Sequence, residues 1–258
     1  MPFAPANGID LYYETHGPEG APALVFAHGA GGNHLSWWQQ VPHFARRFRC
    51  VTFDHRGYGQ SHDLPDGPGG AAYVDDLRGL LDHLGVARAT LIGQSMGGWT
   101  SLGFTLRYPE RVERLVMADT HGGLALPEIA QIMRDAAASR PELPPGVHVA
   151  AGARMAEEQP ALQFLYGQID ALNRPRSPRD LGALLAAAGS PSPTAVAAIT
   201  TPVLFIVGEE DIVIPPAVIE LSAACIPGAR LERVPRAGHS VYFERPAIFN
   251  ELVERFLG

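Results

Sequence analysis

A serine flanked by glycines is the first residue of this sequence with the setting of a nucleophile. Residues 91–99 read LIGQSMGGW, and the five central positions fit the pattern G-x-S-x-G around Ser95. In this pattern the serine occupies a sharp turn between a strand and a helix, and the apolar run before it predicts such a strand. The glycines leave room for the turn, and the helix N-terminus favours negative charge. We therefore predict that Ser95 is a nucleophile.

A serine hydroxyl reacts at neutral pH only with a general base, and the base needs an acid to orient it. Among ten histidines, His239 follows the last predicted strand and precedes the last predicted helix, which places it at the same sheet edge as Ser95. Asp211 follows the preceding predicted strand and is the expected acid. Asp119, at the end of an earlier strand, is the alternative acid. The chain order Ser, Asp, His is the one that accompanies a G-x-S-x-G turn.

The glycine-rich segment 26–34, FAHGAGGNH, follows another predicted strand and has the composition of an oxyanion-binding turn. We expect the backbone N–H of Ala30 to point at the carbonyl oxygen under attack, together with the N–H of Met96. Two preset donors form an oxyanion hole, and loss of one donor typically slows catalysis by about 100- to 1,000-fold.

Four residues are expected to contact the substrate. Gly29 belongs to the oxyanion turn, Trp99 to the helix behind the nucleophile, and His121 to the loop after the strand that ends at Asp119. Tyr242 follows the predicted base closely. Packing in the core is the alternative for Trp99 and Tyr242, and solvation is the alternative for His121.

The elements that must position these residues alternate between apolar runs and helical segments, which predicts a parallel sheet with helices on both faces. Strands are expected at residues 9–17, 23–29, 49–57, 89–95, 112–119, 201–211 and 229–235. Helices are expected at residues 36–48, 71–84, 96–108, 215–224 and 246–257.

The alternation stops between residues 122 and 195, where no buried strand is expected. Helices are predicted there at residues 127–138, 159–172 and 180–188. Because this stretch is too long for a simple connection, we interpret it as a helical insertion. The predicted core domain comprises residues 1–121 and 196–258.

The amino-acid composition indicates which classes of binding partner to expect. The 258 residues carry a net charge of −7 without a basic block, so nucleic acid is not an expected partner. The two cysteines, Cys50 and Cys225, are expected to be buried thiols, and no cluster of Cys and His suggests a metal site. We expect no signal peptide, no membrane span and a cytoplasmic location. The expected partner is a small-molecule substrate, and the chain is expected to be a monomer or a homodimer.

Several of these segments together resemble the α/β-hydrolase fold superfamily. The matching segments are HGAGG, DHRGYGQS, GQSMGG, YPERVERLVMAD, PVLFIVGEEDIVIP and AGHSVYFERP. The resemblance implies a sheet of about eight strands with a helical cap after the sixth. It also implies that Ser95 is the nucleophile, Asp211 the acid and His239 the base, without a cofactor or a metal.

Similar motif sets occur in carboxylesterases, enol-lactonases and C–C bond hydrolases. Hydrolysis of a small ester or lactone is the leading hypothesis. Hydrolysis of a C–C bond in a vinylogous diketone is the alternative, although those enzymes often carry Ser-Pro-Gly at positions 55–57 and tryptophan at 240, where this chain has His-Arg-Gly and Ser240. A ligand-binding receptor on the same fold is the third hypothesis.

Overall fold

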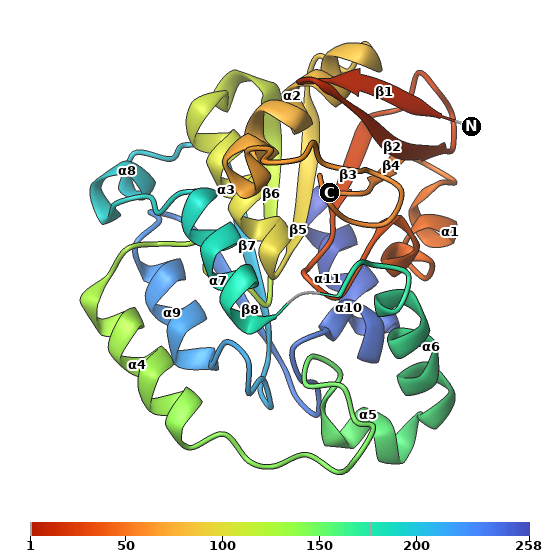
Figure 1. Ribbon diagram of the computed structural model, residues 1–258. Helices are drawn as coiled ribbons and strands as arrows, with labels where there is room; N and C mark the ends of the chain where they lie inside the picture. Colours follow the sequence, from red (N-terminus) through yellow and green to blue (C-terminus); the bar gives the residue numbers. More distant parts are fainter. Residues whose placement is uncertain (1, 176) are drawn as a thin grey trace.

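One mixed sheet forms the centre of the molecule. The computed structural model describes residues 2–175 and 177–258, and within them eight strands run in the order β1-β2-β4-β3-β5-β6-β7-β8 (Figure 1). The strands are Phe3–Ala6 (β1), Ile9–His16 (β2), Ala23–Ala27 (β3), Arg49–Phe53 (β4), Ala89–Gln94 (β5), Val112–Ala118 (β6), Val203–Gly208 (β7) and Arg230–Val234 (β8). β2 pairs antiparallel with both β1 and β4, and the remaining pairs are parallel. The expected fold class, a mostly parallel sheet of eight strands, is confirmed.

The central strands are apolar because both faces of the sheet are covered. Every residue of β3, β5 and β7 is buried, as expected for parallel strands between two layers of helices. The carboxyl ends of parallel strands lie at one edge of the sheet. The segments that leave β3, β5, β7 and β8 at this edge carry the glycine-rich turn at residues 28–34, Ser95, Asp211 and His239, respectively.

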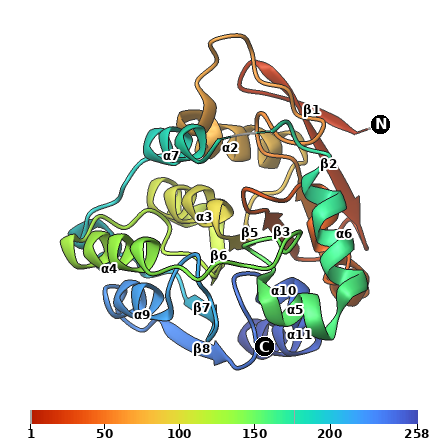
Figure 2. The same ribbon diagram turned by 60° about the horizontal axis from the view of Figure 1, so that its bottom comes forward.

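Helices cover both faces (Figure 2). The first face is covered by α2 (Tyr73–His83), α3 (Met96–Arg107) and α9 (Pro216–Ala224). The short helices η2 (Gly69–Ala72) and η3 (Pro109–Arg111) adjoin α2 and α3 and add no residue to the core on this face. The second face is covered by η1 (His34–Trp37), α1 (Val41–Phe44), α10 (Val241–Glu244) and α11 (Pro246–Leu257).

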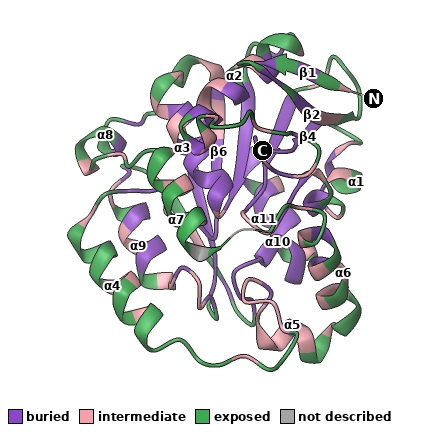
Figure 3. Cartoon of the chain, in the orientation of Figure 1, coloured by how far each residue is buried: buried purple, intermediate pink, exposed green. Residues whose placement is uncertain are grey.

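The segment between β6 and β7 is helical, and its described residues form no strand. Its helices are α4 (Pro127–Ala138), α5 (Gly152–Glu158), α6 (Pro160–Asp170), α7 (Pro178–Ala187) and α8 (Pro193–Ala197). Much of its surface is exposed (Figure 3). We call residues 122–195 the inserted segment. The boundary expected at residue 195 falls inside α8.

Two local expectations were wrong. The helix expected over residues 36–48 is two short helices, because Pro42 has no backbone N–H and cannot continue a helix from the preceding turn. The strand β1 was not expected, since its sequence FAPA has weak strand propensity. Pro5 is tolerated there because β1 is an edge strand.

The two cysteines were both expected to be buried. Cys50 is buried as expected, whereas Cys225 is half-buried.

A buried ion pair fixes the loop after β4. Arg56, which is 1% exposed, donates to both carboxylate oxygens of Asp76 on α2, at 2.8 and 2.6 Å. It also donates to Asp63 and to the carbonyl of Asn7. The guanidinium therefore joins this loop to α2 and to the turn between β1 and β2.

Replacing Asp76 with alanine should destabilise the protein strongly, because the variant leaves a buried guanidinium without its main partner. The expected loss in free energy of unfolding is about 3–5 kcal/mol, measured by urea denaturation. Asp75→Ala on the same helix is the control, since Asp75 pairs with exposed Arg107, and such pairs are worth about 0–1 kcal/mol. Equal losses in the two variants would contradict this role of Arg56.

Candidate active site

The turn at Ser95 has a backbone that few residues adopt. Ser95 lies between β5 and α3 with φ +48° and ψ −118°. A Cβ atom at Gly93 would lie 2.6 Å from the carbonyl oxygen of Gly97, and one at Gly97 would lie 2.1 Å from that of Ala27. Both glycines are therefore required by backbone contact, and the turn projects the serine hydroxyl at the carboxyl edge of the sheet.

Ser95, His239 and Asp211 are brought together from three separate strand ends. His239 Nε2 lies 2.9 Å from Ser95 Oγ, and His239 Nδ1 lies 2.7 Å from Asp211 Oδ2. The other carboxylate oxygen, Asp211 Oδ1, accepts the backbone N–H groups of Val213 and Ile214 at 2.7 and 2.9 Å. This arrangement can move a proton from the serine hydroxyl to an imidazole held by a fixed carboxylate.

Asp119, the alternative acid, has other partners. Its Oδ1 accepts the N–H of Gly208 at 3.0 Å, and its Oδ2 accepts the N–H of Val241 at 3.1 Å. Burial and the nearby charge of Asp211 hold the pKa of Asp119 well above its usual range. The geometry therefore pairs the imidazole with Asp211, while Asp119 joins the loops that follow β7 and β8.

Opposing influences act on the protonation of His239. Burial favours the neutral ring and lowers its pKa, whereas the charge of Asp211 and its hydrogen bond favour the imidazolium. The carboxylate outweighs the burial, so the pKa of His239 is raised above 6.5. A histidine in this state accepts a proton more readily than one in water.

The glycine-rich turn after β3 lies directly beside Ser95. A Cβ atom at Gly29 would lie 3.1 Å from Ser95 Cβ, so the backbone approaches the serine closely at this point. His28 braces the turn, since its Nδ1 bonds the carbonyl of Gly29 at 2.8 Å and its Nε2 accepts the N–H of His55 at 2.9 Å. Met96 begins α3, where a backbone N–H has no partner within the helix.

Two polar residues at the site were missed in the sequence. Gln94, the last residue of β5, donates from Nε2 to the carbonyl oxygen of His239 at 2.8 Å. Glu244 accepts the backbone N–H groups of Gly238 and Ser240, on either side of His239. The only signal for Gln94 was a polar residue at the end of an apolar strand. The signal for Glu244 was an acid five positions after the histidine.

Comparison with known proteins identifies the family of this chain. Residues 22–246 match the family described as alpha/beta hydrolase fold. The chain belongs to this family. It is 36% identical over 116 residues to 3-oxoadipate enol-lactonase 2 of Acinetobacter baylyi. The aligned region covers 45% of this chain and 43% of the lactonase.

Two solved structures of the family resemble this α/β hydrolase over nearly its whole length. The enol-lactonase from Burkholderia xenovorans LB400 superposes with a TM-score of 0.80 at 28% identity, covering 99% of both chains. Est816, described as an N-acyl homoserine lactone degrading enzyme, superposes with a TM-score of 0.79 at 28% identity, covering 99% of this chain and 100% of that one.

Trp99 and His121 line one cavity beside α3 of this α/β hydrolase. Their rings are in edge-to-face contact, with centroids 4.7 Å apart. Both line a cavity of about 270 Å³ whose other walls come mainly from apolar residues of α4, α7 and the loop before α4. Burial lowers the pKa of His121 to about 4, so the ring is neutral at pH 7.

Tyr242 lies elsewhere. Its ring is fully buried and packs against two other aromatic rings. The ring centroid lies 4.5 Å from that of Trp37 and 6.3 Å from that of Phe249. The structure therefore places Tyr242 in the core packing on the second face of the sheet, which was the alternative to a substrate contact.

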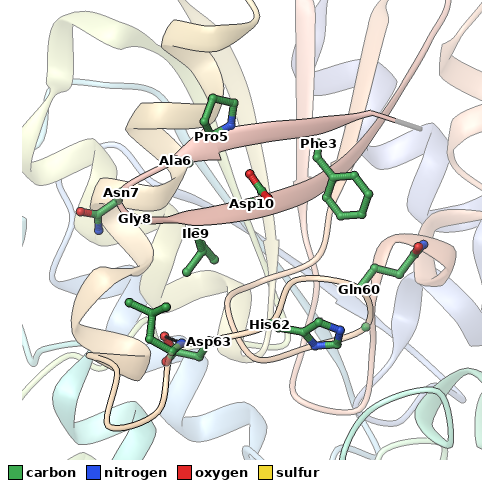
Figure 4. A pocket seen from close by; sticks show the side chains of 12 residues that line it. Phe3, Pro5, Ala6, Asn7, Gly8, Ile9, Asp10, Gln60, His62 and Asp63 are labelled. Atoms are coloured by element: carbon green, nitrogen blue, oxygen red, sulfur yellow. Dashed lines mark hydrogen bonds between the residues drawn. The ribbon is translucent and has the colours of Figure 1, made fainter.

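A larger cavity of about 810 Å³ lies away from the serine of this α/β hydrolase. It is formed by the β1–β2 hairpin and residues 59–64, and none of its lining residues belongs to the Ser95 site (Figure 4). Among the described residues, no group of three or more His, Cys, Asp or Glu side chains is placed to hold a metal ion. In the same part of the chain, no helix has the length and hydropathy to cross a bilayer.

The two histidines in these sites should titrate in opposite directions from the ordinary value. We expect the ring of His239 to gain its proton above pH 6.5 and the ring of His121 to stay neutral until about pH 4. Side-chain NMR across pH 4–9 checks this, with the variants His239→Gln and His121→Gln assigning the signals. A His239 midpoint below 6.5 would show that Asp211 does not outweigh burial.

Proposed function

We propose that this protein is a serine hydrolase that cleaves a small ester or lactone through an acyl-enzyme intermediate. The observation that carries the proposal is the unbroken chain of contacts from Ser95 through His239 to Asp211. The backbone N–H of Ile214 holds the carboxylate of Asp211. The side chains of Gln94 and Glu244 hold the loop that carries His239, so the three residues stay in contact.

The proposed reaction uses groups of this chain at each step. Ser95 Oγ attacks the substrate carbonyl while His239 Nε2 takes the serine proton. Asp211 stabilises the imidazolium, and the N–H groups of Ala30 and Met96 hold the negative oxygen. His239 then gives the proton to the leaving alkoxide oxygen, which departs as an alcohol or stays attached as the opened end of a lactone. Water, deprotonated by His239, attacks the acyl carbonyl. The bond to Ser95 Oγ then breaks, His239 returns the proton to Oγ, and the acid is released.

The inserted segment is proposed to act as a cap that shapes the substrate pocket. Its helix α7 packs through Leu184 and Leu185 against a small apolar cluster that contains Met96, the second proposed oxyanion donor. The cavity at Trp99 and His121 lies between α3 and the inserted segment, and its apolar lining suits a short acyl chain or a lactone ring. The neutral His121 and Ser190 offer polar groups to a substrate oxygen there.

The printed names of the relatives, two enol-lactonases and a lactone-degrading enzyme, support an ester or lactone bond. Cleavage of a C–C bond uses the same three residues and is the alternative outcome. At position 240 this chain has a small, fully buried serine whose hydroxyl donates to Ala150. No side chain there extends toward a bulky diketone, so the ester or lactone is favoured. A receptor would bind such a ligand without turnover.

Replacing Ser95 with alanine should remove the activity. We expect hydrolysis of short-chain and aryl esters or lactones to fall by more than about 1,000-fold. A fluorophosphonate probe should label the parent protein at Ser95 and fail to label the variant. Ser222→Ala, a buried serine on α9, is the control.

Three results would contradict the proposal. If Ser95→Ala hydrolysed esters at the rate of the parent protein, Ser95 would not be the nucleophile. Turnover of a ring-fission diketone in the absence of ester or lactone turnover would favour the C–C hydrolase. Binding of a lactone without turnover by the parent protein would favour the receptor.

Shortening the side chain at Trp99 should widen the pocket. We expect Trp99→Leu to raise the ratio of kcat/KM for a hexanoyl ester to that for an acetyl ester by about 10-fold or more, since each methylene is worth 10-fold or more in a fitted pocket. Trp38→Leu is the matched control, because Trp38 is 41% exposed on the far side of the core. An unchanged ratio in Trp99→Leu would show that the acyl chain lies elsewhere.

A further inference from the structure

Glu244 holds the backbone on both sides of His239 with one side chain. Its Oε2 accepts the N–H of Gly238 at 2.8 Å, and its Oε1 accepts the N–H of Ser240 at 3.1 Å. The carboxyl is 2% exposed. Because both oxygens are used, the segment 238–240 is clamped at its two ends, and the imidazole projects from the residue between them.

This clamp arises from the local sequence. Glu244 ends the short helix α10, and its side chain turns back toward the N–H at the start of that helix, as an acid does in a capping box. The second oxygen reaches two residues further back, to Gly238. A Cβ atom at position 238 would lie 3.2 Å from Glu244 Oε1, so the glycine allows the carboxyl to sit against the backbone.

Burying the carboxylate of Glu244 at this position costs free energy. Burial raises the pKa of Glu244 to about 7, against the opposing effect of the two N–H groups. The adjacent guanidinium does not pair with it: Arg245 donates instead to Glu158 and to the carbonyl oxygen of Glu244. Buried charges without a cation are rarely kept for stability alone.

We propose that Glu244 is a positioning residue for the general base. It fixes the His239 loop so that the imidazole lies in line with Ser95. This inference rests on the proposed function, in which His239 takes the proton of Ser95.

The charged and titratable groups around this carboxyl come from several elements. Arg245 and Asp211 act on Glu244, and Glu244 in turn acts on Tyr166 of α6. The charges of Asp211, Asp119 and Glu244 all favour the protonated form of His239. Removing the charge at position 244 should therefore lower the pKa of His239, and keeping the charge on a shorter side chain should not.

Two substitutions separate the charge from the clamp. E244Q removes the charge and one acceptor, whereas E244D keeps the charge but is too short to hold both N–H groups. We expect both to lower kcat for ester hydrolysis by about 10-fold, since small misplacement of a catalytic group is costly, with KM changed less than about twofold. In E244Q alone, the acid limb of the pH–rate profile should move to lower pH. E251Q, an exposed glutamate on α11, should behave as the parent protein.

NMR titration of His239 in the same variants measures the pKa of the ring in the absence of any substrate. A lowered midpoint in E244Q with an unchanged one in E244D supports the proposal even if ester hydrolysis is not the activity. Parent-like kcat in E244D, or an unmoved His239 midpoint in a folded E244Q, overturns it. If thermal unfolding shows that E244Q does not fold, the kcat of E244D decides.

Discussion

The backbone at Ser95 is the constraint on which the site depends. A non-glycine residue held at φ +48° and ψ −118° costs about 1–3 kcal/mol, and surrounding contacts must hold it there. The N–H of Ser95 donates to the carbonyl of Ala118, and the hydroxyl of Thr120 donates to the carbonyl of Ser95. The neighbouring strand β6 and the loop after it thus lock the turn, and the oxyanion turn can approach only because position 29 is glycine.

Buried polar side chains then tie the neighbouring strand ends to one another. Gln94 at the end of β5 holds the carbonyl of His239, and Asp119 after β6 holds the loops after β7 and β8. Glu244 holds the same His239 loop from the helix that follows it. The loop that carries His239 is therefore fixed by three separate elements, which explains how Ser95 and His239, 144 positions apart, meet at 2.9 Å.

The sequence predicted the parts of this protein that depend on local chemistry. The G-x-S-x-G turn, the apolar central strands, and the helices 127–138 and 246–257 were visible because glycine, proline and hydrophobic periodicity act over a few residues. Gln94, and the choice between Asp119 and Asp211, depend on contacts between distant strands. A sequence pattern cannot show which of two carboxylates faces an imidazole. Tyr242 was ambiguous for the same reason, since an aromatic ring suits a pocket wall and a core equally.

The chain enters the inserted segment from β6 and leaves it into β7, and these two strands are direct neighbours with Leu115 opposite Val203. The two ends of the inserted segment lie together, since the N–H of Ala125 donates to the carbonyl of Pro191 at 2.9 Å, and the segment supplies none of the three residues Ser95, Asp211 and His239. Changes in its length or sequence leave the register of the strands untouched. The inserted segment can therefore vary while the contacts among Ser95, His239 and Asp211 stay the same.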